Sequence, residues 1–105
     1  MSTIAMVRTV PLDPYVMETL MPDLVGHDRA PSAFLVYLKL WHAAAGPGRK
    51  IAISLSSLAV ETGLSKSSVQ AALRRLVKRG LVTSRRDGPT AVPLYLIHAP
   101  WRSQR

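Results

Sequence analysis

The sequence has no cysteine, few carboxylates and no long apolar run. Without cysteine, the chain can form neither a disulfide framework nor a thiolate metal site. Its most apolar stretch, residues 33–46, carries Lys39 and is too short to cross a bilayer. The first residues also lack the apolar core of a signal peptide. We therefore expect a soluble, cytoplasmic protein, and the length of 105 residues fits one domain.

Negative charge is scarce and unevenly placed. The chain has 6 acidic residues against 14 lysines and arginines, a formal net charge of +8. Residues 1–28 hold one basic and four acidic residues, whereas residues 29–105 hold 13 basic and two acidic residues. This asymmetry favours a polyanion, such as nucleic acid, as the partner of the C-terminal three-quarters.

The acidic N-terminal stretch has the signals of an arm followed by a helix. Residues 1–12 are typical of an extended arm or a short strand. Asp13 and Pro14 indicate a helix start, because aspartate can cap free amides and proline fits the first turn. Pro22 predicts a kink or an end, and Gly26 predicts a second break. This stretch either packs on the rest of the chain or forms a two-fold interface, and we favour a homodimer.

Three further helices are predicted by apolar periodicity and by the capping, glycine and proline residues at their ends. The first covers residues 31–45, followed by a short strand at residues 50–54. The second covers residues 55–62, with Ser54 as its cap and Gly63 after its last turn. The apolar positions of the first helix are Phe34, Leu35, Leu38, Trp41 and Ala45.

The third of these helices begins only three residues later, so a tight turn joins two helices. Ser65 is its predicted cap and Gly80 closes it. Its predicted core positions are Val69, Ala72, Leu73 and Leu76.

A hairpin is predicted after Gly80. Two apolar-biased segments within residues 81–97 flank an Asp87-Gly88 turn. Pro93 cannot donate to a sheet ladder and is expected at an edge or a bulge. Residues 98–105 form a basic tail, which we expect to be partly loose, and Trp101 within it has no predicted place.

The helix over residues 65–79 has an unusual outer face. At 100° per residue, Val69, Leu73 and Leu76 cluster within about 60° and define the buried side. The opposite side is small, polar and basic, without a carboxylate. It includes like-charge pairs four residues apart (Arg74 with Lys78 and Arg75 with Arg79), which cost a few tenths of a kcal/mol each. A phosphate backbone would offset that cost, so the pattern indicates a recognition helix inserted at its N-terminal end.

The segment ISLSSLAVETGLSKSSVQAALRRLVKRGLVTSRRDGPTAVPLYLI resembles the winged helix-turn-helix of bacterial transcription regulators, such as the MarR and GntR families. The matching pieces are SSLAVETGLS for the support helix and turn, and SKSSVQAALRRLVKRGLV for the recognition helix. The resemblance covers residues 50–97 closely and extends to about 31–97 if the preceding helix is included. It implies a mainly α fold with a small β-hairpin wing, an α+β winged helix.

Residue types and the resemblance together nominate a DNA-contacting set. Short side chains let the helix enter a groove, and Gln70 can make a bidentate contact to adenine worth roughly 1–3 kcal/mol of discrimination. The resemblance places the first turns of the helix at the bases and the wing at phosphate or the minor groove, although Asp87 argues against deep minor-groove insertion. The predicted base contacts are Lys66, Ser67, Ser68, Gln70 and Ala71. The predicted backbone and wing contacts are Ser56, Ser57, Arg74, Arg75, Lys78, Arg85, Arg86, Arg49 and Lys50. Helix capping accounts for Ser56 and Ser57 equally well.

The sequence gives little indication of a catalytic site or a metal-binding site. His27, His42 and His98 are far apart, and the GHD stretch would need ligands brought by folding. No Ser-His-Asp or paired-carboxylate arrangement can be nominated, so we expect neither an enzyme nor a cofactor.

We expect three segments and one main function. Residues 1–30 are predicted to be a packing or dimerisation extension, residues 31–97 the winged helix-turn-helix, and residues 98–105 the tail. The leading hypothesis is sequence-specific binding of double-stranded DNA by a small transcription regulator. One alternative is a replication or partition protein of a plasmid or phage. Another is a winged helix that contacts protein or RNA.

Overall fold

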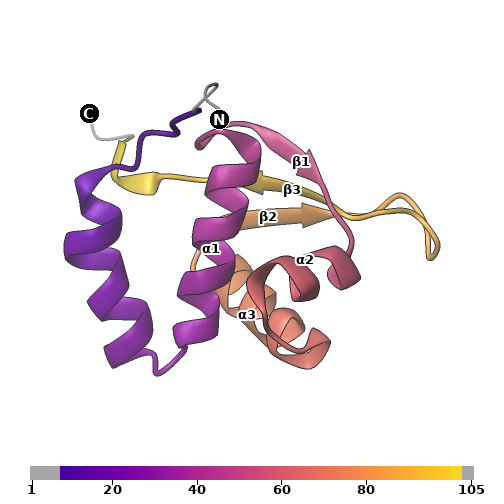
Figure 1. The fold of residues 1–105 in the computed structure, drawn as a ribbon, viewed down its shortest axis with the longest axis horizontal. Coiled ribbons are helices and arrows are strands. Elements are labelled where there is room, and N and C mark those ends of the chain that lie inside the picture. The colour runs from indigo at the N-terminus through magenta and orange to yellow at the C-terminus, as the bar shows by residue number, and fades with distance from the viewer. Residues whose placement is uncertain (1–7, 103–105) are drawn as a thin grey trace, which may run out of the picture.

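The computed structural model describes residues 8–102. Two short helices lie beside a three-helix core and a small sheet (Figure 1). The elements are η1 (Val16–Leu20), η2 (Pro22–His27), α1 (Pro31–Ala44), β1 (Lys50–Ala52), α2 (Leu55–Thr62), α3 (Lys66–Lys78), β2 (Val82–Arg85), β3 (Leu94–Ile97) and η3 (Pro100–Arg102). This is the mainly helical α+β arrangement with a hairpin wing that the sequence predicts.

The sheet is antiparallel with the strand order β1-β3-β2. One of its faces, represented by Val82, Tyr95 and Ile97, is buried in the core. The other face carries Thr83 opposite Leu96, and Leu96 opposite Lys50. Because side chains alternate along a strand, residues that are neighbours in β2 point to different faces of the sheet.

The core positions predicted for α3 are confirmed. Val69, Ala72, Leu73 and Leu76 are all buried, and they pack with α1 in one cluster. The stripe predicted for α1 is partly wrong. Leu35 is 45% exposed, and Ala45 lies beyond the helix in a left-handed conformation. Val36, Tyr37 and Leu40 take the inward positions instead, so the buried side of α1 is wider than the predicted stripe.

The helix boundaries around the tight turn are also confirmed. The Ser54 and Ser65 hydroxyls accept hydrogen bonds from the backbone N–H groups of Ser57 and Ser68, each at 3.1 Å. Gly63 has a φ of 79°, which a glycine adopts without the steric cost of a Cβ atom. The short polar signals in the sequence therefore fix where α2 ends and α3 begins.

The predictions at Pro22 and Gly26 are confirmed in part, because η2 begins at Pro22 and ends at His27, one residue after Gly26. The chain is helical through both residues, with the wider π-type bonding in which Met21 N–H donates to the Val16 carbonyl. A wider turn moves the proline ring away from the carbonyl that it would meet in an α-helix. Val16, Leu20 and Leu24 are buried against the rest of the chain, so burial compensates for the irregular bonding.

Residues 98–102 are not a loose tail. Trp101 stacks between Tyr15 and Trp41, at centroid distances of 4.4 and 6.3 Å. Asp13, predicted as a helix cap, accepts hydrogen bonds from Trp101 Nε1 at 2.8 Å and from Arg102 at 2.6 and 2.7 Å. We call this group, Asp13 with the three aromatic rings and Arg102, the terminal clamp. It joins the two ends of the described chain.

The predicted hairpin turn differs from the observed one. Arg85 pairs with Leu94, so residues 86–93 form a loop rather than a two-residue turn. Gly88 is absent from the positive-φ residues of the described chain, so the Asp87-Gly88 pair does not form the tight hairpin turn. Pro93 immediately precedes the central strand, not an edge strand or bulge, and its carbonyl accepts a bond from Ile53 N–H at 3.2 Å. Because Pro93 lies outside the strand, its missing N–H group removes no hydrogen bond from the sheet.

The contacts of Asp13 in the terminal clamp should make the free energy of unfolding depend on pH in the acid range. Hydrogen bonds from Arg102, aided by one from Trp101 and opposed by burial, hold the pKa of Asp13 below its ordinary value of 3.8. Its stabilising contribution is therefore present above that value and is lost as the pH falls through the lowered pKa. We expect Asp13→Asn to lower the free energy of unfolding at neutral pH and to make it less dependent on pH in the acid range. Urea unfolding between about pH 6 and about pH 2 measures both effects.

The matched control is Asp87→Asn, which removes a carboxylate that is 82% exposed at the wing. We expect it to leave the acid dependence close to that of the wild type. An unchanged profile for Asp13→Asn would show that the clamp does not stabilise the fold through this carboxylate.

Candidate nucleic-acid interface

The first turns of α3 present an open polar surface. Lys66, Ser67, Gln70 and Ala71 are exposed. Ser68 is half-buried, and its hydroxyl accepts a hydrogen bond from the Ser65 hydroxyl at 3.0 Å. Four of the five predicted base-contacting residues therefore share one accessible surface, while Ser68 also takes part in the helix cap.

Two cations continue this surface along α3. Arg74 and Lys78 are exposed, and neither has an ion-pair partner among residues 8–102. They line a shallow groove between α3 and the wing, together with Leu73, Val77, Ser84 and Tyr95. Tyr95 is 3% exposed, and burial raises the pKa of its hydroxyl. It stays neutral at physiological pH. We call the surface formed by Lys66, Ser67, Gln70, Ala71, Arg74 and Lys78 the open face of α3.

Arg75 in α3 and Arg79, the residue after its last turn, face the N-terminal segment. Arg79 Nη2 donates to Asp23, and Arg79 Nε lies 3.5 Å from Asp28 Oδ2. Arg75 Nη1 lies 3.9 Å from the same Asp28 oxygen. The repulsion between Arg75 and Arg79 is therefore offset within the protein, which corrects the interpretation that this pair needs a phosphate backbone.

The strand register separates the predicted wing contacts. Arg85 lies on the outer face of the sheet, where it lines a hollow with Lys50, Thr83, Leu94 and Leu96. Ser84, its neighbour, points to the α3 side. Arg86 is exposed in the loop that extends beyond the sheet (Figure 1). The structure thus brings Lys50 close to Arg85, but it places both away from the open face of α3.

The remaining predicted contacts lie at the ends of other elements. Arg49 is exposed just before β1, and Ser56 is exposed in the first turn of α2. Ser57 is half-buried, and both its N–H and its hydroxyl bond to Ser54. Capping therefore accounts for the position of Ser57 in this structure.

Folding also brings together a group that sequence spacing did not nominate as a site. Asp23, His27 and Asp28 place one ligand atom each within 4.8 Å of one another. His27 Nδ1 lies 3.0 Å from Asp28 Oδ1. Both carboxylates already face the guanidinium of Arg79, and this positive charge opposes the binding of a metal cation.

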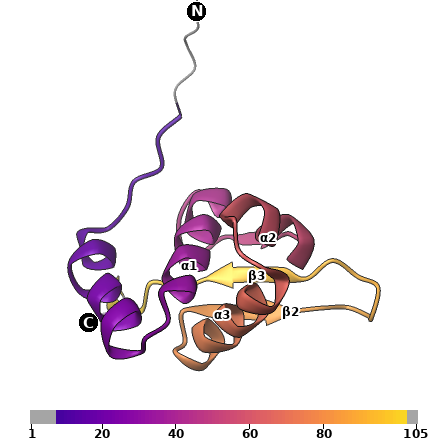
Figure 2. The same ribbon diagram turned by 60° about the horizontal axis from the view of Figure 1, so that its bottom comes forward.

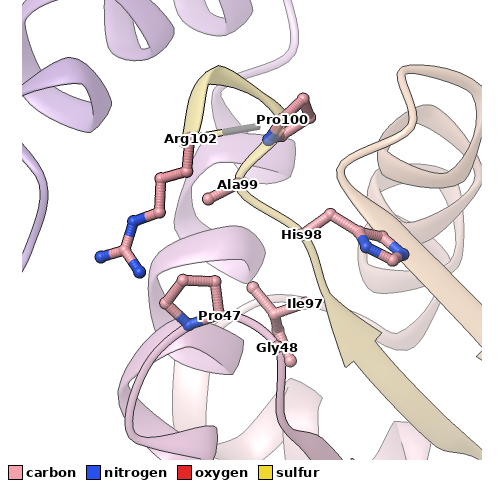
Figure 3. Close-up of a pocket in the computed structure, with 7 residues that line it drawn as sticks. All are labelled: Pro47, Gly48, Ile97, His98, Ala99, Pro100 and Arg102. Atoms are coloured by element: carbon pink, nitrogen blue, oxygen red, sulfur yellow. The ribbon is translucent and has the colours of Figure 1, made fainter. Parts of the chain in front are cut away.

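A second hollow lies at the opposite end of β3 from the wing. Figure 3 shows that it is lined mainly by apolar atoms, that Arg102 extends to one side and that the His98 ring points to the other. The His98 ring has its own partner, Thr83, with Nε2 and Oγ1 2.6 Å apart. The hollow therefore lacks converging polar groups that would select a ligand.

Comparison with known proteins agrees with the geometry of α2, α3 and the wing. Residues 40–91 match the model for the MarR family. The match supports a MarR-type winged helix in this segment. No curated protein and no solved structure showed a significant match to the chain. The MarR-type domain suggests a DNA-binding transcription regulator, and such a domain is not typical of enzymes. Within residues 8–102, every helix is too short or too polar to span a membrane.

The groove beside α3 includes residues that sequence reasoning did not nominate. Ser84 and Tyr95 come from different strands and reach α3 through the antiparallel pairing, in which they face each other. The alternation of side chains along a strand could have indicated this, because it places Ser84 on the same face as the apolar Val82. The ion pairs of Arg75 and Arg79 had no comparable local signal.

Proposed function

We propose that this chain is a sequence-specific double-stranded DNA-binding protein, a small transcription regulator of the MarR type. Helix α3 enters the major groove with its N-terminal turns, and the hairpin lies beside it as the wing. The observation that carries the proposal is the open face of α3. Its residues are accessible, and its cations face no carboxylate in the described part of the chain.

The arrangement on α3 separates reading from positioning. Ser67, Gln70 and Ala71 are small or amide-bearing residues, as expected for contacts to base edges. Arg74 and Lys78 lie farther along the helix, beside the wing groove, where guanidinium and ammonium groups suit phosphate oxygens. Lys66 at the first helical position can reach the backbone on the other side.

The N-terminal segment supports the second part of the proposal, a homodimer. It packs on its own chain through Val16, Leu20 and Leu24. Met17 and Val25 nevertheless remain 44% and 38% exposed on the same two short helices. Figure 2 shows this segment on the side of α1 away from the wing. We propose that these exposed residues contribute to a two-fold contact that presents two copies of α3.

Selection of bound duplexes from a random pool at physiological salt tests the function directly. We expect one enriched motif with two inverted half-sites, about 10 base pairs apart from centre to centre. An RNA pool selected in parallel should show no enrichment. Equal retention of all duplex sequences would contradict sequence-specific binding, and a motif without symmetry would contradict the dimer.

Gln70→Ala tests the reading role of α3. A lost bidentate contact should cost roughly 1–3 kcal/mol against the selected site and relax the preference at one base pair. Competition binding with single-base variants of the site measures both quantities. Unchanged affinity and unchanged preference would show that Gln70 lies outside the reading surface.

Lys78→Ala tests the positioning role. We expect weaker binding to all duplexes alike, and a plot of log K against log salt that is flatter by about 0.9, the value for one phosphate contact. Titrations at several salt concentrations, on selected and scrambled duplexes, provide the measurement. A loss confined to the selected duplex would place Lys78 at the bases instead.

A further inference from the structure

We propose that Asp23 and Asp28 occupy the C-terminal end of α3 in place of DNA phosphates, so that Arg75 and Arg79 contribute little to DNA binding. The inference rests on the proposed function and refines its surface. It assigns Asp28 as a positioning residue, which restricts the backbone contacts of α3 to Lys66, Arg74 and Lys78. We call Asp23, Asp28, Arg75 and Arg79 the internal ion-pair cluster.

The geometry of the cluster resembles the way in which arginine holds a phosphate. Two carboxylates from η2 and the residue after it converge on Arg79, through Nη2 and Nε. Asp28 Oδ2 is shared, because Arg75 Nη1 also lies 3.9 Å from it. A planar guanidinium can donate to carboxylate oxygens in the same way as it donates to phosphate oxygens. The two aspartates therefore occupy the donors that a DNA phosphate would use.

Burial makes Asp28 the centre of the cluster. Its side chain is only 5% exposed, whereas Asp23, Arg75 and Arg79 are 38%, 41% and 31% exposed. The Oδ2 atom is buried and has no hydrogen bond among the described residues. His27 bonds to the other oxygen, Oδ1, and the two arginines are the cations near Oδ2. Drawing them to a phosphate would leave Oδ2 buried without a nearby cation.

The ionisation of Asp28 agrees with this role. The hydrogen bond with His27 and the charges of Arg79 and Arg75 lower the pKa of Asp28, against the opposing effect of burial. Asp28 is therefore an anion at physiological pH. The hydrogen bond to Asp23 in turn raises the pKa of Arg79, so both sides of the pair remain charged.

The consequence for DNA binding concerns specificity. Phosphate contacts strengthen binding to every sequence and carry no sequence information. By withholding two cations of α3 from the DNA backbone, the cluster lowers non-specific affinity while Ser67, Gln70 and Ala71 remain free to read bases. The ratio of specific to non-specific binding should rise as a result.

Asp28→Asn tests the proposal in the full-length chain. It is nearly isosteric and removes the charge that holds Arg75. On a scrambled duplex we expect the salt slope to become steeper by about 0.9, so that the ratio of affinities between about 50 mM and about 200 mM salt grows roughly threefold. The matched control is Glu18→Gln, which makes the same change of charge on an exposed residue of η1. It should leave the slope unchanged.

A double-mutant cycle separates a released arginine from a general change of charge. Arg75→Ala should leave the salt slope unchanged in the wild-type background and should cancel the steeper slope in the Asp28→Asn background. An equal effect of Arg75→Ala in both backgrounds overturns the proposal, because Asp28 would then have no influence on that arginine.

The experiment remains decisive if Asp28→Asn does not fold, as judged by circular dichroism. Arg75→Ala alone is then compared with Lys78→Ala on the same duplex. The proposal expects a loss of slope for Lys78→Ala only, and it fails if the two variants lose the same amount. Absence of any salt-dependent DNA binding by the wild type would instead contradict the proposed function itself.

Discussion

The burial of one side of α3 against α1 determines which residues of this helix are exposed to a partner. Val69, Ala72, Leu73 and Leu76 are enclosed by the core cluster, so rotation of the helix about its axis is fixed. Because the helix turns by about 100° per residue, this packing leaves Ser67, Gln70 and Ala71 facing outward. The Ser65 cap fixes the residue at which the helix begins.

The N-terminal segment completes this core instead of standing apart from it. Its apolar residues fill the side of α1 away from the wing, and the terminal clamp ties both ends of the described chain to Trp41. A small domain buries a modest fraction of its surface, so added apolar contacts matter to its stability. The described part of the segment leaves the open face of α3 exposed, and its ion pairs with α3 are those of the internal ion-pair cluster.

The sequence predicted those features that depend on residues close together in the chain. Caps such as Ser54 and Ser65, the glycine after α2 and the apolar repeat in α3 act over one to four residues, and all were located correctly. The errors concern features that depend on distant residues. Trp101 and Asp13 are 88 positions apart, and Arg79 and Asp23 are 56 apart. At Pro22 the chain continues in helical form into η2, since burial of Leu20 and Leu24 outweighs the local preference for an end. The candidate DNA contacts on α3 followed from periodicity, whereas the separation of Ser84 from Arg85 needed the strand register.

The internal pairing changes the meaning of the charge asymmetry along the chain. Three of the four carboxylates in the first 28 residues, Asp13, Asp23 and Asp28, pair with arginines of the C-terminal part. Three of the eleven excess positive charges at residues 29–105 are thus balanced inside the fold, so the charge of that part alone overstates what remains for a partner. The cations of α3 that stay without a carboxylate partner in the described chain, Lys66, Arg74 and Lys78, all lie on the open face. These cations run along the exposed side of α3 from Lys66 to Lys78, whereas Arg75 and Arg79 face the N-terminal segment. The positive field of this helix is therefore strongest on the open face.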